Sequence, residues 1–452
     1  MAKKLYIILA CLVILAPCAF CKEEEAGKVI DLSLGSAISI AFQNNKDIRI
    51  QEQELNVSKA KILGARAEFL PTATLEAGYT HNGAVLKYPG TDMPKKDPGI
   101  LTGYNNDNQL AATVNQTIYN GGANVANFKQ SLLGLNTSEV TLRVKKLDVE
   151  FEAKRLYYGL LLAYETERIA QELVDQARAH YEDVQQKFEQ GTASRFDVLQ
   201  SKVAVSLLIP ELVKAKNAVD LIMADLKKLM GLKMRDTIVV NERLQYALID
   251  IKEGEFLKEA YLNQPEMILK SLGVDINKWS IELAKSGWRP QVNAFGTYAY
   301  QSNDWADMIN NRHSNWQAGV SVSMPIFDAW SSKAKVDEAK AKYWQAVLDK
   351  LNLVDQIAVD IRRACLDMKQ AEAIIDSQKD NVEEAKEALK ISIVSYDNGV
   401  GTNLDVLDSQ TSLAQVQQNL SQGIYDYLMA EAFLDRTRGK SILREAKNEK
   451  TD

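Results

Sequence analysis

The sequence predicts a mostly α-helical protein that also contributes strands to a membrane β-barrel. Three observations predict this fold class. The chain is one structural unit written twice, four of its segments alternate in polarity with a period of two, and four long stretches have the pattern of extended helices. Each half is expected to follow the same plan, namely a helix, two strands, a very long helix and a second long helix.

Residues 1–21 are predicted to be a secretory signal peptide. Two lysines precede an apolar run over Leu5–Ala16, and small residues follow it. A short apolar run in this order is typical of a signal peptide. Two alternatives stay open, an N-terminal anchor helix and lipidation at Cys18, although Pro17 fits a lipoprotein site poorly.

The composition argues against an enzyme and against a nucleic-acid partner. The formal net charge is only −6 over 452 residues, which is too mild and of the wrong sign for nucleic-acid binding. The three histidines have no metal-ligand spacing, and no phosphate-binding glycine loop or Gly-x-Ser-x-Gly elbow occurs. Cys365 has no partner for a disulfide once the cysteines near the signal are set aside. We expect no catalytic residues, no metal and no cofactor.

The internal repeat predicts the domain boundaries. Gly399 lies 208 residues after Gly191, and Gly439 lies 208 residues after Gly231. A repeat of this length is a duplicated domain and not a short solenoid unit. The predicted domains are the signal peptide at 1–21, the first repeat at 22–231, a connecting segment at 232–253, the second repeat at 254–439 and a charged C-terminal tail at 440–452.

Four segments alternate apolar residues with small polar residues. They are predicted to be strands at 72–82, 108–119, 290–302 and 314–327. No run of about 18 apolar residues follows the signal, whereas a barrel strand needs only about 9–11 residues of alternating polarity. The pattern suits one face on lipid and the other on a wet lumen. A soluble sheet is the alternative, but it predicts more charged side chains than Glu76 alone.

Long helices are predicted at 122–190, 194–231, 329–398 and 402–438. The stretch 330–398 contains neither glycine nor proline. At 1.5 Å per residue it would extend roughly 100 Å, far more than a globular domain needs. Apolar residues recur every seven positions through both of the longest stretches, which predicts coiled-coil packing between neighbouring helices.

Four strands per chain also predict an oligomer. Membrane strands leave no open edge in lipid, and closed barrels begin at about eight strands, so a single chain cannot close one. Two copies would supply eight strands, whose side chains fill the interior. Three copies would supply twelve, which leaves space for a pore, so a trimer is expected if the protein conducts.

The duplicated plan resembles that of the TolC-type outer-membrane efflux protein family. The segment Tyr396-Asp-Asn-Gly-Val-Gly-Thr-Asn-Leu-Asp-Val-Leu-Asp408 is similar to the family's turn between its last two long helices. The resemblance extends from about residue 30 to 440. It implies a homotrimer with one twelve-stranded barrel in the outer membrane of a Gram-negative bacterium and a coiled-coil helical tunnel in the periplasm.

The resemblance further implies a function, partners and a gate. The function is export of small molecules, drugs or proteins in a tripartite efflux or type I secretion system. The partners are a periplasmic adaptor (membrane fusion) protein, an inner-membrane pump and outer-membrane lipid. Asp405 and Asp408 match the family's paired gate aspartates, and Asp197 and Tyr396 match partners in its closing network. This chain has Gly401 where a family arginine helps to hold the closed state.

Helix capping is a second interpretation of the same turns, and it is compatible with a gate. A hydroxyl residue and an aspartate stand three apart after a turn glycine in each half, which is the spacing of a capping box. The residues are Ser194 and Asp197 after Gly191, and Thr402 and Asp405 after Gly399. Asp408 lies one turn deeper, where capping does not explain it. Three copies would place six carboxylates around an opening, which would select cations and bind multivalent ones.

The alternative function is a soluble periplasmic coiled-coil scaffold or adaptor without a pore. Such a protein would explain the heptad pattern of the long helices. It would not explain four strands, compatible with lipid, that occur as two matching pairs.

Overall fold

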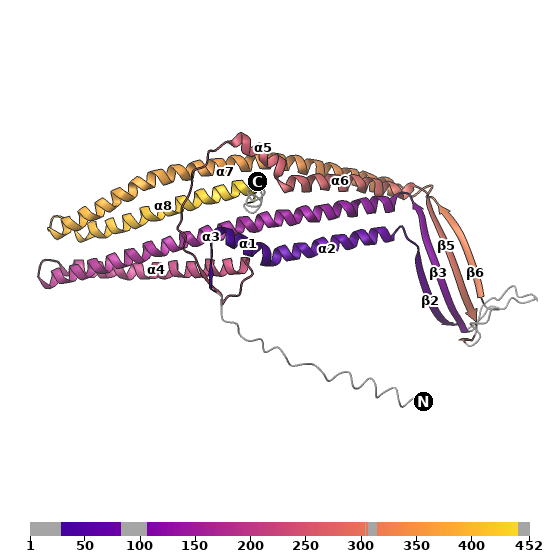
Figure 1. Cartoon of the computed structure of the whole chain (residues 1–452), viewed down its shortest axis with the longest axis horizontal. Coiled ribbons are helices and arrows are strands. Elements are labelled where there is room, and N and C mark those ends of the chain that lie inside the picture. The colour runs from indigo at the N-terminus through magenta and orange to yellow at the C-terminus, as the bar shows by residue number, and fades with distance from the viewer. Residues whose placement is uncertain (1–28, 83–105, 303, 306–313, 442–452) are drawn as a thin grey trace, which may run out of the picture.

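The computed structural model describes residues 29–82, 106–302, 304–305 and 314–441. The predicted signal peptide, Cys18 and most of the C-terminal tail lie outside these residues. The molecule is a long array of helices with a curved sheet at one end (Figure 1), and this sheet has four strands.

Two hairpins of long helices make up most of the length. The first hairpin consists of α3 (Ala123–Glu189) and α4 (Arg195–Leu229), and the second hairpin of α7 (Ser331–Asp397) and α8 (Asn403–Thr437). Both repeats have a helix of 67 residues followed by one of 35. The duplication seen in the sequence is therefore also a duplication of element lengths.

The helix that precedes the strands is broken in two in each half, where the sequence predicted one. The elements are α1 (Leu34–Asn44) and α2 (Lys46–Ala67), then α5 (Glu253–Asn263) and α6 (Pro265–Lys285) followed by the short 3-10 helix η1 (Ser286–Trp288). Asn45 leaves the helical region, with ψ of 128°, and its side chain accepts hydrogen bonds from the amides of Asp47 and Ile48. In the second half Pro265 has no amide hydrogen to continue the helix.

The sheet is antiparallel and contains the four predicted strands in the order β2-β3-β5-β6. Their bounds are Thr72–His81, Asn106–Asn120, Gln291–Ser302 and Ser314–Ser323. The predicted end of the last strand at 327 is wrong. Ser323 pairs with Gln291, the first residue of β5, so residues 324–327 have no partner strand among the described residues. Pro325 also lacks an amide hydrogen.

A small second sheet joins the N-terminal end to the connecting segment. Strand β1 (Val29–Asp31) pairs in parallel with β4 (Thr237–Val239). The sequence indicated a short β-branched run here but not its partner, because three residues are too few to show an alternating pattern.

The turns from sheet to long helix have the same backbone in both repeats but different residues. Gly121 and Gly122 have φ of 68° and 91°, and Ala329 and Trp330, which lie 208 residues later, have φ of 52° and 67°. Residues other than glycine are strained in this left-handed region by roughly 1–2 kcal/mol each. The turn geometry is therefore kept at an energetic cost in the second repeat.

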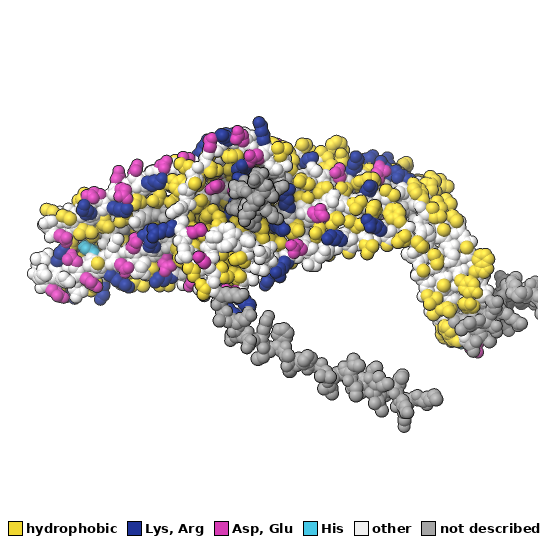
Figure 2. All heavy atoms as spheres, viewed as in Figure 1, with side chains coloured by type: hydrophobic (Ala, Val, Ile, Leu, Met, Phe, Trp, Pro, Cys, Tyr) yellow, Lys and Arg dark blue, Asp and Glu magenta, His cyan; other side chains and the backbone are white. Residues whose placement is uncertain are grey.

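The core lies at what we call the equatorial level, where α1, α5 and the connecting segment pack on the hairpins. In the first repeat α1 packs on Tyr157 and Leu160 of α3, and in the second α5 packs on Ile361 and Met368 of α7. Figure 2 shows charged side chains spread over the helices, whereas the visible face of the sheet is largely apolar. No helix within the described ranges is long and apolar enough to cross a membrane.

Candidate functional site

The candidate site is the pair of turns at the far tips of the two hairpins (Figure 1). Gly191 and Gly399 close the turns with φ of 78° and 73°. A left-handed residue just past a helix end favours glycine, because any side chain is strained there. Each turn is followed by the first turn of a long helix, α4 or α8, which carries the predicted acidic residues.

Both turns end in a capping box. The carboxylate of Asp197 accepts from the amide and hydroxyl of Ser194, at 3.1 and 2.7 Å. The carboxylate of Asp405 accepts from the amide and hydroxyl of Thr402, at 2.8 and 2.7 Å. These bonds hold the pKa of the Asp405 carboxyl below its usual range, because the Thr402 side chain and amide stabilise the ionised form. Asp405 therefore stays charged at any physiological pH.

Asp408 is exposed one turn deeper in α8 and takes no part in the capping box. The i,i+3 spacing puts it on the same face of the helix as Asp405. The structure thus presents two carboxylates in a line at the start of α8, one fixed by capping and one on an exposed side chain.

Tyr396 does not bond to Asp197, although the resemblance implied a closing network that includes both. Its hydroxyl is buried without a hydrogen-bond partner. Its ring instead packs edge-on against His180, with centroids 5.3 Å apart, and beneath the ammonium of Lys187 at 4.4 Å. The Asp197 carboxylate is engaged in capping and does not bind Tyr396. Tyr396 contributes to the tips through its ring, which packs against His180 and Lys187.

Sequence reasoning missed the residue that joins the two hairpins, Asn403. Its side chain is buried, with 2% of the residue exposed. Its carbonyl oxygen lies 2.7 Å from Nε2 of His180 and accepts from the hydroxyl of Ser201 at 3.0 Å. Its amide nitrogen donates to Gln200 at 2.9 Å. One side chain of α8 thus binds both helices of the first hairpin.

An ion pair lies beside this cluster. Lys187 of α3 binds Asp397 at the end of α7 at 2.6 Å, and Asp183 of its own helix at 2.7 Å. Both carboxylates raise the pKa of the lysine, against the opposing effect of its burial. No pattern in the sequence indicates the contacts of Asn403 with His180, Gln200 and Ser201, or that of Lys187 with Asp397, because the two partners lie in different repeats.

The glycine at the position of the family arginine is closely packed. A Cβ atom at Gly401 would lie 3.0 Å from Cβ of Ser395 and 3.1 Å from the amide nitrogen of Tyr396. The turn folds back over this residue, so a larger side chain would force it to shift. In this turn the two hairpins are linked by the contacts of Asn403 and Lys187.

The tip contacts are one end of a longer seam between α3 and α8. The helices run antiparallel. At the equatorial level Arg436 binds Asp148 at 2.7 Å and Lys154 binds Asp435 at 3.0 Å. Toward the tips the hydrogen bonds between α3 and α8 are longer and join uncharged groups. For example, Gln418 donates to the hydroxyl of Thr166 at 3.3 Å. Ionic contacts therefore hold this seam at its equatorial end, and the Asn403 cluster holds it at the tips.

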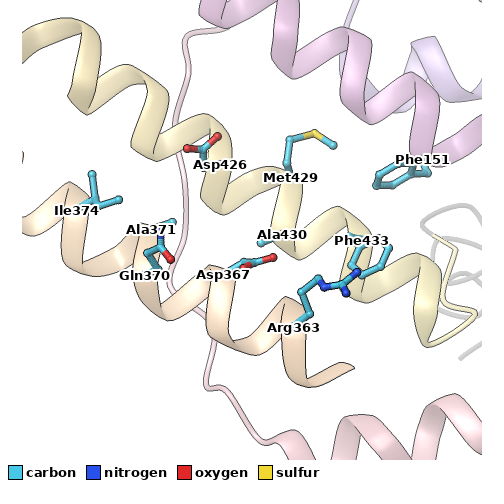
Figure 3. Close-up of a pocket in the computed structure, with 10 residues that line it drawn as sticks. All are labelled: Phe151, Arg363, Asp367, Gln370, Ala371, Ile374, Asp426, Met429, Ala430 and Phe433. Atoms are coloured by element: carbon cyan, nitrogen blue, oxygen red, sulfur yellow. The ribbon is translucent and has the colours of Figure 1, made fainter. Parts of the chain in front are cut away.

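A groove of about 470 Å³ opens on the seam near its equatorial end, between α3, α7 and α8 (Figure 3). Phe151 of α3 and Phe433 of α8 meet there, with ring centroids 6.3 Å apart. Arg363, Asp367 and Asp426 line the groove from the second hairpin. Among the described residues there is no group of three or more His, Cys, Asp or Glu side chains that could hold a metal ion.

A family profile described as outer membrane efflux protein matches residues 37–232 and 256–440. The chain belongs to the outer membrane efflux protein family. Residues 233–255 separate the two matched stretches. The resemblance inferred from the sequence is confirmed.

Relatives of this outer membrane efflux protein are distant in sequence, and the matched share of each chain varies. Outer membrane protein TolC of Vibrio cholerae is 22% identical over 413 residues, 88% of each chain. The alkaline protease secretion protein AprF of Pseudomonas aeruginosa is 22% identical over 300 residues, which are 66% of this chain and 62% of that relative. The crystal structure of the Campylobacter jejuni CmeC outer membrane channel has a TM-score of 0.78, with 18% identity, and covers 95% of this chain and 94% of CmeC.

These findings confirm the predicted fold class and function. The helix-rich chain with few strands matches solved outer-membrane channels, and the family is one of transport proteins. The protein is an outer-membrane channel for efflux, and the alternative of a soluble scaffold is not supported. TolC-type channels are homotrimers that work with periplasmic adaptors and inner-membrane pumps.

Proposed function

We propose that this chain is one protomer of a trimeric export duct whose sheet closes a barrel in the outer membrane and whose helical tips form the periplasmic gate. The observation that carries the proposal is the pair of free sheet edges. Strands β2 and β6 each pair on one side only within the part of the chain that the structure describes. Open strand edges are not tolerated in lipid, so another copy must pair with each edge.

The side chains of the edge strands support a membrane location. Trp316, Val320 and Val322 of β6 are 73%, 65% and 68% exposed, and Leu75 of β2 is 73% exposed. Apolar side chains at every second position of an exposed face suit contact with lipid. Three copies would join β6 of one protomer to β2 of the next and supply twelve strands, which is wide enough for a pore.

The periplasmic end would be narrowed by carboxylates. If the tips converge on the threefold axis, Asp405 and Asp408 contribute six carboxylates to one ring. Such a ring attracts cations and resists the passage of anions. Capping fixes Asp405 in place, so Asp408 is the more mobile charge of the pair.

The partners follow from the channel role. A passive duct needs a source of energy elsewhere, which an inner-membrane pump with a periplasmic adaptor would supply. V. cholerae TolC and P. aeruginosa AprF are named for an outer-membrane location and for secretion of a protease, respectively. For this chain we propose export of small molecules, drugs or proteins without any enzymatic activity.

Reconstitution tests the proposal. The purified protein should migrate as a trimer before heating, remain in the membrane pellet after a carbonate wash and produce discrete conductance steps in a planar bilayer. A correctly folded protein that leaves the pellet and gives no conductance would refute the duct and restore the scaffold.

A further inference from the structure

We propose that Asn403 is a positioning residue of the gate: bound to His180 and Ser201, it latches the second hairpin to the first, and acid releases the latch. This inference rests on the proposed function, because it concerns how the gate at the same turns is held shut.

The position of Asn403 in the helix makes it suited to hold the gate. It is the first residue of α8, between the capping residue Thr402 and the acidic residue Asp405. Any movement of its side chain therefore moves the turn that carries the carboxylates. A buried asparagine must satisfy its polar atoms, and here the partners all belong to the first hairpin. Separation of the hairpins would break these bonds together.

The latch is local to the tips. At the equatorial level the seam is held by Arg436 and Lys154 with their carboxylate partners, and Arg436 also reaches Glu266 of α6 at 3.4 Å. The weaker bonds between the two ends offer little resistance. Loss of the Asn403 contacts should therefore let the second hairpin swing outward about its equatorial end, without dissociation of the seam.

His180 makes the latch sensitive to pH. It is 9% exposed and is covered by the Tyr396 ring and the Asn403 side chain. Burial lowers the pKa of His180, although the Asn403 bond opposes this shift. Of the charged groups that face it, Asp183 of α3 and Asp397 of α7 favour the imidazolium form and Lys187 of α3 disfavours it.

Because the pKa of His180 is lowered in the latched state, acid weakens the latch. The latched state prefers neutral imidazole, whereas a released, hydrated His180 has an ordinary pKa of about 6.5. Above about pH 6.5 the latch has its full stability, because His180 is neutral in both states. This stability is lost as the pH falls below that value toward the lowered pKa of the latched state. A drop from pH 7.5 to 5.5 should therefore populate the released state.

The test measures the distance between the tips directly. Spin labels on cysteines placed at Thr192 and Val400, both exposed in the turns, report the separation of the two hairpins within one protomer. Labelled chains are diluted into trimers of unlabelled full-length chains, so that each trimer holds one labelled pair. Wild type at pH 7.5 should give one narrow distance distribution.

Asn403→Ala should add a population of longer distances, with an increase in the open fraction of roughly tenfold, since it removes several buried hydrogen bonds. Gln200→Ala removes one of these bonds and should act in the same direction with a smaller effect, which covers the case that Asn403→Ala does not fold. Asn419→Ala is the matched control, because this exposed asparagine of the same helix bonds only along α8, to Gln415. It should leave the distribution unchanged.

His180→Gln separates the latch from a general packing role. Glutamine can donate to the same oxygen but does not titrate, so the variant should stay narrow at both pH 7.5 and pH 5.5, whereas wild type broadens in acid. Unchanged distances in both Asn403→Ala and Gln200→Ala, or equal broadening of His180→Gln and wild type, would overturn the proposal. Because distances need no current, a latch that opens in a protein without conductance would contradict the proposed function alone.

Discussion

Lys187 and Asp397 form an ion pair of 2.6 Å that joins the ends of α3 and α7 at the tips of the molecule. The ammonium of Lys187 also lies 4.4 Å from the centre of the Tyr396 ring. The lysine is thus held by a carboxylate and an aromatic face of the second hairpin while it remains part of the first.

Removal of the charge at Asp397 should loosen the tips modestly. The carboxylate is 52% exposed, and such pairs contribute about 0.2–1 kcal/mol. Asp397→Asn should raise the open fraction in the spin-label measurement about two- to fivefold, and high salt should have a similar effect on wild type. Asp376→Asn, which breaks an exposed pair within α7, is the control. A larger effect than that of Asn403→Ala would place the main lock at the ion pair instead.

Asp405 and Asp408 should respond differently to substitution, because only Asp405 caps the helix. Asp405→Ala should destabilise the start of α8 and speed hydrogen exchange there, while Asp408→Ala should not. The cap is stable above the lowered pKa of Asp405 and is lost as the pH falls through it, so wild type should keep its slow exchange at pH 5. Equal exchange rates in the two variants would contradict this assignment.

A lysine on the outer face of β6 should impair the trimer. Val320→Lys puts a charge on the proposed lipid face, at a cost of about 2–4 kcal/mol near the middle of the bilayer and less near its surfaces. Ser321→Lys places the same charge on the opposite face and should be tolerated. The temperature at which the trimer dissociates on a gel reports the difference. Equal loss in both variants would argue against the assignment of faces.

The two turns between sheet and helix should respond oppositely to glycine and alanine. Gly121→Ala would bring Cβ to 2.6 Å from the backbone oxygen of Ser286 in addition to left-handed strain, so we expect a loss of more than about 2 kcal/mol. Ala329→Gly relieves such strain and should gain up to about 1 kcal/mol, after the greater freedom of glycine in the unfolded chain is offset. Thermal unfolding in detergent measures both, and destabilisation by Ala329→Gly would show that Ala329 makes contacts that outweigh its strain.

The sequence was most informative where a pattern repeats over many residues. The period-two segments predicted all four strands of the larger sheet, and the long stretches of helical pattern predicted all four long helices. Only the end of β6 was extended too far. That error arose because Met324 and Ile326 continue the alternation after the partner strand has ended. The parallel pairing of β1 with β4 was not predicted, since three-residue strands leave no period to detect.

The candidate site was only partly predictable. The capping residues could be named because their partners lie three positions away. The seam could not, since Asn403 bonds to residues more than 200 positions away, at Gln200 and Ser201, and to His180 in the other repeat. Contacts of that kind depend on how the two hairpins pack, which a single sequence does not record.

Conductance of single trimers with multivalent cations on the periplasmic side tests the central claim, that this is a pore gated by the carboxylates of its tips. Wild type should give a small cation-selective current that trivalent cations block, and Asp408→Ala should conduct more, with weaker selectivity and weaker block. Asp376→Ala, which removes an exposed acid far from the turns, should behave as wild type. A wild-type current that is insensitive to trivalent cations, or an Asp408→Ala current identical to it, would contradict the account.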